Sequence, residues 1–242
     1  GNLSGIIFLG DQIIREGSEF NEWYGYRSSG LFQTQTDVDT SPLLTGAEKP
    51  GDVKFVDISG PENKPDGSID PTNDKTLLGG SLPRYEYGGV INLGYKGFDL
   101  SVMFQGVGKR LSRLTDDMVY QTIAWYTFPS FVDGHYYSEY NTPEQNLNAQ
   151  FPRLSQVGYK GNNYSMSDFW LIDGSYFRLK NLSLSYTLPE QIIRRLDVKG
   201  IRIFATVSDL FSLDRFPKGW DPEASASAYI ARTWTGGLSI KF

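Results

Sequence analysis

Four aspartates in and just after the stretch DISGPENKPDGSID are the clearest set of side chains that could bind a metal ion. Carboxylate oxygens are ligands that Ca²⁺ prefers, and the set consists of Asp57, Asp66, Asp70 and Asp74. The spacing of these residues does not match the EF-hand pattern, and Asp and Gly are also common turn residues. A calcium site and a solvated acidic turn are therefore the two interpretations of this segment.

Six aromatic residues close together in the sequence form a second candidate site. Flat aromatic faces stack on sugar rings and on peptide side chains, and they bring a large contact area at a low cost in conformational entropy. Exposed aromatics also anchor membrane proteins at the level of the lipid headgroups, so loop packing or an interface belt is the alternative. The residues predicted to contact a substrate or a partner are Trp125, Tyr126, Phe128, Phe131, Tyr136 and Tyr137.

Catalytic chemistry has little support in the residue pattern. The chain has one histidine, His135, and no cysteine, which excludes a thiolate nucleophile and a usual zinc site. Ser130 and Asp133 are near His135 in the sequence, but no serine lies in a G-x-S-x-G elbow. The adjacent carboxylates Asp116 and Asp117 would point to opposite faces of a strand. We expect no enzymatic activity; an outer-membrane hydrolase that uses His135 is the alternative.

Composition favours strands and turns over helices. Aromatic residues make up 14% of the 242 residues, and Gly contributes 26, a mixture that is typical of strands and turns. The formal charge of −5 argues against nucleic acid as a partner, because nucleic-acid-binding proteins present a basic face. No apolar run reaches the roughly 18 residues of a membrane-spanning helix, whereas the strands of a membrane barrel alternate and never form such runs.

Alternation of apolar and polar residues identifies the elements that must position these sites. Two alternating runs, Tyr87–Tyr95 and Phe98–Gln105, flank the dipeptide Lys96-Gly97, which predicts an antiparallel hairpin with a tight turn. Further strands are predicted at Tyr176–Leu188, Ile201–Leu210 and Arg232–Phe242. The long segments Asp37–Gly80 and Trp125–Asn163 are predicted to be external loops that contact the substrate or a protein lid.

Three features favour a membrane barrel over a soluble sandwich. The polar faces are small and neutral, aromatics lie near strand ends as they do at membrane interfaces, and very short turns alternate with long loops. The alternating end of the chain, from Trp234 to Phe242, resembles an outer-membrane assembly signal. We predict an all-β fold, an antiparallel transmembrane β-barrel segment. A soluble carbohydrate-binding β-sandwich and a passive porin or adhesin barrel are the alternatives.

Several segments, in order along nearly the whole chain, resemble the C-terminal barrel region of SusC/RagA-type TonB-dependent transporters of Bacteroidota. They are WYGYRSSGLFQTQ from Trp23, PGDVKFVD from Pro50, DGSID from Asp66, NDKTLLGGSLPRYEYGGVINLGYKGFDLSVMFQG from Asn73, WLIDGSYFRLKNLSLSYTLP from Trp170 and WDPE from Trp220. This family often carries an acidic loop of the DxNGDGxID type that looks like a calcium loop. Here Pro61 and Pro65 interrupt and lengthen that loop.

The resemblance implies that residues 1–242 are the C-terminal part of a barrel of about 22 strands, with the plug domain and the N-terminal strands outside this chain. No targeting signal is visible in the residues that follow Gly1, so we expect a processed start or an internal fragment. The implied function is import of a large nutrient, a glycan or a peptide, across the outer membrane. The implied partners are a SusD-like surface lipoprotein, outer-membrane lipid, and the TonB complex, which acts through the absent N-terminal part. No cofactor is expected apart from the calcium ion considered above.

Overall fold

The computed structural model describes residues 5–60, 62, 64–115, 119, 129–154, 161–194, 197–224 and 230–242. The chain forms two compact units. We call Pro83–Arg110 with Asp173–Phe242 the sheet unit, and Gly1–Leu82 with Leu111–Ile172 the loop unit. The named strands pair in antiparallel fashion, which confirms the all-β prediction. Within the described ranges, no helix has the length and apolar character needed to span a membrane.

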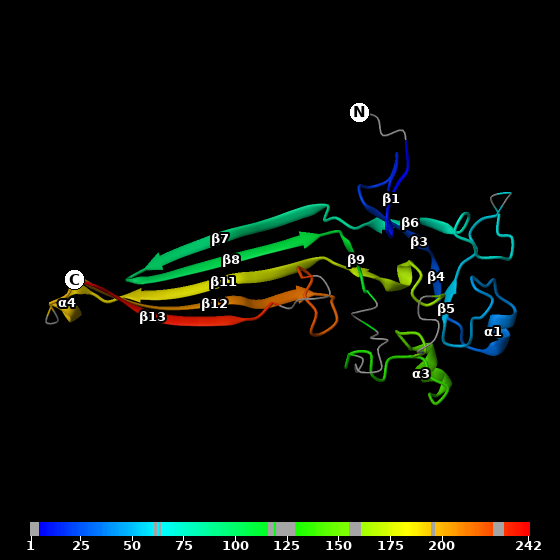
Figure 1. Cartoon of the computed structure of the whole chain (residues 1–242). Coiled ribbons are helices and arrows are strands. Elements are labelled where there is room, and N and C mark those ends of the chain that lie inside the picture. Colours follow the sequence, from blue (N-terminus) through cyan, green and yellow to red (C-terminus); the bar gives the residue numbers. More distant parts are fainter. Residues whose placement is uncertain are drawn as a thin grey trace. The chain divides into compact units, whose positions relative to one another are not determined.

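The sheet unit is built on a 5-stranded sheet in the order β13-β12-β11-β8-β7. Figure 1 shows these strands side by side, from β7 at the upper edge to β13 at the lower edge. The strands are β7 (Tyr85–Tyr95), β8 (Phe98–Gly108), β11 (Tyr176–Thr187), β12 (Gly200–Asp214) and β13 (Thr233–Lys241). A short helix, α4 (Glu190–Ile193), lies between β11 and β12 in the sequence. All the strands predicted from alternation are confirmed as strands, with ends that differ by a few residues.

The turn between β7 and β8 consists of Lys96 and Gly97, as the sequence predicts. Both residues have positive φ angles, 47° and 86°, as a type I′ turn requires. Glycine adopts this conformation freely, whereas a lysine adopts it at some cost. The turn fixes the register by placing Tyr95 opposite Phe98, and every cross-strand pair further along the hairpin follows from it.

The strand register separates apolar from polar side chains across the whole sheet. One row of neighbours consists of Ile91, Val102, Leu182, Val207 and Trp234. The adjacent row, on the opposite face, consists of Asn92, Ser101, Ser183, Thr206 and Thr235. Since successive side chains of a strand point to opposite faces, the sheet has one apolar face and one face of small polar groups. Val90, Met103, Val107 and Phe204 are apolar exceptions on the polar face.

The apolar face is exposed over much of its area. Leu93 is 60% exposed, and Leu238 is 57% exposed. A soluble sandwich would bury such a face against a second sheet, and an exposed apolar area of this extent indicates a surface that is covered by a partner or by lipid. Among the described residues, β7 and β13 each have a strand neighbour on one side only.

The loop unit contains shorter elements (Figure 1). A 4-stranded sheet has the order β1-β2-β3-β6, with β1 (Ile7–Leu9), β2 (Gln12–Ile14), β3 (Glu22–Tyr26) and β6 (Lys75–Gly80). Two strand pairs join β4 (Ser28–Leu31) to β5 (Val53–Phe55) and β9 (Leu111–Arg113) to β10 (Leu171–Asp173). The helices of this unit are α1 (Gln35–Asp39), α3 (Pro143–Leu147) and the single turn η1 (Asp168–Trp170).

A small core joins segments of the loop unit that are distant in the sequence. Its buried members are Tyr26, Leu31, Val53, Phe55, Ile69 and Tyr137, and the rings of Tyr26 and Phe55 stack with centroids 5.0 Å apart. The interpretation of Asp37–Gly80 as loop alone was therefore wrong in part, because this segment supplies β5, β6 and three residues of the core. Trp125–Asn163 likewise includes helix α3. Strands of three residues are too short to give a periodic signal in the sequence.

Candidate functional site

The loop unit contains a pocket of about 620 Å³, here called the loop pocket. Two of the six aromatics predicted to contact substrate, Tyr136 and Tyr137, line it. Ser138, Glu139 and Tyr140, which directly follow these two in the sequence, also line it. The other lining residues come from distant segments, namely Gln33, Thr34, Gln35, Lys49, Pro50, Arg153 and Leu154. The pocket thus combines aromatic rings, amides, hydroxyls and charges, which is the mixture that small polar ligands require.

Tyr137 forms a fixed wall of the loop pocket. Its side chain is buried, its hydroxyl donates a hydrogen bond to the Gln33 carbonyl over 3.0 Å, and its backbone amide bonds to the Phe151 carbonyl over 3.0 Å. The ring lies so close to Gly51 that a Cβ atom there would collide with it. Gly51 also has a φ of 88°, so both the space and the backbone conformation require glycine at this position.

A buried carboxylate, Asp52, neutralises the guanidinium at the wall of the loop pocket. Arg153 Nε lies 2.7 Å from Asp52 Oδ1, and Arg153 Nη2 donates to Asp52 Oδ2 over 3.1 Å. Asn163 Nδ2 and the Lys49 amide also donate to this carboxylate, each over 2.8 Å. Because Arg153 is paired in this way, its charge is not offered to a ligand as an isolated cation.

Tyr140 stands at the rim of the loop pocket with 91% of its surface exposed. The charged side chains of Lys49 and Glu139, which also line the pocket, are exposed and of opposite sign. The charges of the lining therefore balance, which suits an uncharged ligand or one with groups of both signs better than a polyanion. An exposed tyrosine beside amide and hydroxyl groups can stack on a ligand and hydrogen-bond to its edge.

Two further candidates from the sequence that the structure describes, Phe131 and His135, do not line the loop pocket. Trp125, Tyr126 and Phe128 lie outside the described residues. Phe131 packs against Phe151, with ring centroids 5.8 Å apart. His135 is exposed; its amide donates to the Val132 carbonyl over 3.0 Å, and its own carbonyl accepts hydrogen bonds from the amides of residues 150 and 151. These backbone bonds give His135 a place in a turn.

The four aspartates predicted as metal ligands accept hydrogen bonds from backbone amides. Asp74, which is 0% exposed, accepts from Ile58 and Ser59 on Oδ1 over 2.8 and 3.2 Å and from Asp70 on Oδ2 over 2.8 Å. Asp57 accepts from the amide of Gly67 over 2.6 Å. These carboxylates therefore close and cap the turns of the acidic loop.

Asp66 and Asp70, the other two predicted metal ligands, also accept hydrogen bonds within turns. Asp66 accepts from the Ser68 amide over 3.0 Å. Asp70 accepts from the Thr72 amide over 2.7 Å, and hydrogen bonds from Thr72 and Asn73 hold the pKa of Asp70 below its ordinary value. Across the part of the chain that is described, no group of three or more His, Asp or Glu side chains is arranged to hold a metal ion. The calcium site stays a prediction.

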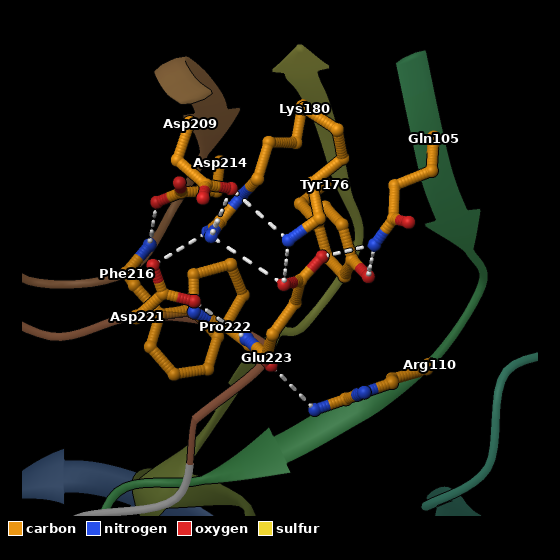
Figure 2. A network of polar contacts seen from close by, with 11 residues as sticks. Gln105, Arg110, Tyr176, Lys180, Asp209, Asp214, Phe216, Asp221, Pro222 and Glu223 are labelled. Atoms are coloured by element: carbon orange, nitrogen blue, oxygen red, sulfur yellow. Dashed lines mark hydrogen bonds and ion pairs between the residues drawn. The ribbon is translucent and has the colours of Figure 1, made fainter. Parts of the chain in front are cut away.

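A network of charged side chains lies on the polar face of the sheet unit (Figure 2). Arg178 is its centre, with a side chain only 2% exposed, and its Nη2 lies 2.5 Å from Asp221 Oδ2. Arg178 Nη1 lies 3.4 Å from Glu223 Oε2 and 3.7 Å from Asp209 Oδ1. Lys180 Nζ lies 3.0 Å from both Asp209 and Glu223. We call these five residues the Arg178 network.

Irregular strand pairing builds the Arg178 network. The register of β11 shifts between Leu179 and Asn181 against both β8 and β12, and Asp209 in β12 has a φ of 51°. Such a bulge redirects side chains, and here Lys180 and Asp209 meet across the two strands. The other two acids, Asp221 and Glu223, come from the WDPE segment.

The Arg178 network fastens residues 221–223 to the sheet. Burial alone would raise the pKa of Glu223, but hydrogen bonds from Lys180 and Tyr176 and the nearby positive charges together lower it below its ordinary value. Gln105 also donates to Glu223, and Arg110 Nη2 donates to the Pro222 carbonyl over 3.0 Å. A buried cation without such partners would be strongly destabilising, so the network has a structural role.

Comparison with known proteins shows similarity to TonB-dependent receptors. No family model matches the chain. The chain is 28% identical over 96% of its length to TonB-dependent receptor P3 of Formosa agariphila, of which it covers 23%. It is 32% identical over 36% of its length to TonB-dependent receptor SusC of Bacteroides thetaiotaomicron, of which it covers 9%. These relatives are receptors by name.

Solved structures agree with this class at the level of the fold. The RagAB peptide importer in its open-open state matches 100% of this chain and 25% of that chain, with a TM-score of 0.63 and 17% identity. The closed-closed state of the same importer gives a TM-score of 0.65 with 16% identity, over 98% of this chain and 25% of that one. The resemblance to SusC/RagA-type TonB-dependent transporters is thereby confirmed, and the chain spans about a quarter of the length of P3 and of the solved importer.

Proposed function

We propose that this chain is the C-terminal part of a TonB-dependent outer-membrane transporter and that its sheet unit forms part of the barrel wall. The observation that supports this proposal most strongly is the separation of apolar and polar side chains onto opposite faces of the sheet. Five neighbouring strands carry apolar residues or glycine on one face and mainly polar residues or glycine on the other. In a barrel the first face contacts lipid and the second lines a wet lumen.

The connections of the sheet unit support the same assignment. β7 and β8 are joined by a turn of two residues, whereas the chain between β8 and β11 runs through residues 111–172 of the loop unit. Outer-membrane barrels have short periplasmic turns and long extracellular loops. The loop unit is therefore external in this proposal, and the loop pocket is placed to contact the nutrient or a protein lid.

The proposed activity is import of a large nutrient, without catalysis by this chain. A SusD-like surface lipoprotein would deliver the nutrient, and the TonB complex would act through a part of the protein that lies outside this chain. The RagAB structures are those of a peptide importer, and the balanced charges of the loop pocket accept either a peptide or a neutral oligosaccharide. The proposal therefore includes both classes of nutrient.

The test is fractionation of the source cells with an antibody against this segment, followed by electrophoresis of the outer-membrane fraction with and without boiling. We expect a band far larger than 27.2 kDa in the outer membrane, with a mobility that changes on boiling because a folded barrel resists detergent. We also expect a surface lipoprotein to co-purify with it. A species of about the mass of this chain in the soluble fraction would overturn the proposal in favour of a carbohydrate-binding sandwich.

A further inference from the structure

A second hollow lies at the end of the apolar face of the sheet unit where the strands lead into the loops. Its volume is about 410 Å³, and its lining includes Tyr85, Tyr87, Ser175 and Arg215. We call it the rim hollow. It shares no residue with the loop pocket. Its lining is more polar than the apolar face beside it, so it differs in chemistry from the lipid-facing surface proposed above.

Two tyrosines and two glycines shape the rim hollow. Tyr85 pairs with Gly108, and Tyr87 pairs with Gly106. The rings lie across these glycines so closely that a Cβ atom at either position would collide with them. The Tyr87 hydroxyl donates to the Tyr176 carbonyl over 3.4 Å, which keeps that ring in place. Both rings remain exposed and present flat surfaces to any molecule that enters.

A loosely paired cation lies beside the two rings. The Arg215 side chain is 79% exposed, and its Nε is 3.8 Å from Asp173 Oδ2. The Ser175 hydroxyl donates to Asp173 Oδ1 over 2.5 Å, so Asp173 is held more firmly by Ser175 than by Arg215. An exposed ion pair at this distance contributes little energy, and the planar guanidinium can bind a phosphate through two parallel hydrogen bonds.

The rim hollow is continuous with the apolar face. Phe177 and Leu213 line both, and the Phe177 ring lies 5.8 Å from Phe104 and 6.3 Å from Phe211, measured between centroids. A ligand held at the tyrosines and Arg215 would therefore extend an apolar portion along these side chains. Such a ligand is an amphiphile with a polar head and an apolar tail.

We propose that the rim hollow binds the phosphorylated sugar headgroup of an outer-leaflet glycolipid. Arg215 binds the phosphate, the rings of Tyr85 and Tyr87 stack on the sugar, and Asp173 accepts hydrogen bonds from sugar hydroxyls. The acyl chains lie along Phe177 and Leu213. A carboxylate and two aromatic rings beside the cation favour a sugar phosphate over a simple phosphodiester, which needs neither. This inference rests on the proposed membrane function, because it requires lipid on this face.

The test uses the full-length transporter, purified in mild detergent and examined by native mass spectrometry with added diphosphoryl lipid A or phosphatidylglycerol. We expect lipid A to bind the parent protein and to bind Arg215→Gln about tenfold more weakly, since a hydrogen bond to a charged group is lost. Arg202→Gln is the matched control, because Arg202 is a half-exposed arginine of the same sheet that lies on the polar face. This variant should bind lipid A as the parent does.

Three results would overturn the inference: equal lipid A binding by the parent and Arg215→Gln, equal loss in both variants, or stronger binding of phosphatidylglycerol than of lipid A. Location of each variant in the outer membrane, with a mobility that changes on boiling, is measured in parallel. If the protein is correctly located but does not prefer lipid A, the proposed lipid site in the rim hollow is rejected and the proposed function is not. Failure of the parent protein to enter the membrane rejects the proposed function as well.

Discussion

The sheet unit and the loop unit reach an ordered structure by different means. In the sheet unit, backbone hydrogen bonds between strands of 9 to 15 residues carry most of the order, and alternation decides which face each side chain occupies. In the loop unit, buried polar side chains bond to the backbone. Asn163 accepts from the Val53 amide over 2.8 Å, and Asp74 accepts from three amides. The comparison shows that one chain can combine a wall specified by a repeated pattern with a site specified by individual contacts.

The largest expected effect is at the Arg178 network, where the sheet unit contains a buried charge. Arg178→Met would leave Asp221, Glu223 and Asp209 without their central cation, at a cost of about 3–5 kcal/mol. We expect residues 221–223 to detach from the sheet, with faster hydrogen exchange there, while β11 and β12 keep their ladder. Lys180→Met is the milder control, since Lys180 is more exposed than Arg178. Equal exchange rates in Arg178→Met and the parent would refute the role of the network.

The next effect concerns the loop unit alone. Asp74→Ala would leave three partly buried amide groups without acceptors, at a cost of roughly 3 kcal/mol. Hydrogen exchange at Ile58, Ser59 and Asp70 should become faster, and nutrient uptake should fall, whereas the barrel should keep its resistance to detergent. The control is Asp133→Ala, which removes an exposed carboxylate. Loss of detergent resistance in Asp74→Ala would show that the stability of the sheet unit depends on this loop.

A smaller effect is expected at the loop pocket. Tyr140→Ala would remove an exposed ring worth about 1 kcal/mol of stacking, so the KM for uptake of the peptide or oligosaccharide mixture that supports growth should rise about fivefold. The rate at saturation should stay the same, because the wall is untouched. Tyr95→Ala, which removes an exposed tyrosine of β7, should leave KM at the parent value. A KM for Tyr140→Ala equal to that of the parent would show that the loop pocket does not bind the imported nutrient.

The smallest effect is a dependence of the Arg178 network on pH. Because the pKa of Glu223 is lowered in the folded chain, its contribution to stability is fully present above its unfolded value, 4.5, and is lost as the pH falls through the folded value. Protection of the Asp221 and Glu223 amides against hydrogen exchange, taken relative to the intrinsic exchange rate at each pH, should therefore fall in acid below about pH 4.5. Glu223→Gln should abolish this part of the dependence. A pH profile of Glu223→Gln identical to that of the parent would assign the effect to other acids.

The local pattern of the sequence was sufficient to locate the wall strands. Alternation needs only a few consecutive residues, and side chains of a strand point to opposite faces whatever the neighbouring strand is. The strand predicted at Ile201–Leu210 extends to Asp214 in the structure. The prediction ended too early because Asp209 lies in a bulge, which interrupts the alternation of apolar and polar residues. The WDPE segment contributed to the family resemblance, but no local pattern indicated that its acids contact Arg178.

The sequence by itself determined the strands of the sheet unit, their two faces and the tight turn at Lys96-Gly97, since each depends on residues within one short stretch. Only the tertiary structure decided the register across five strands, the shared core of the loop unit and the composition of both hollows. The loop pocket brings Gln33, Lys49 and Arg153 to Tyr137 from segments up to about a hundred residues apart. Contacts between such distant segments depend on how irregular loops pack, and no short-range pattern encodes that packing.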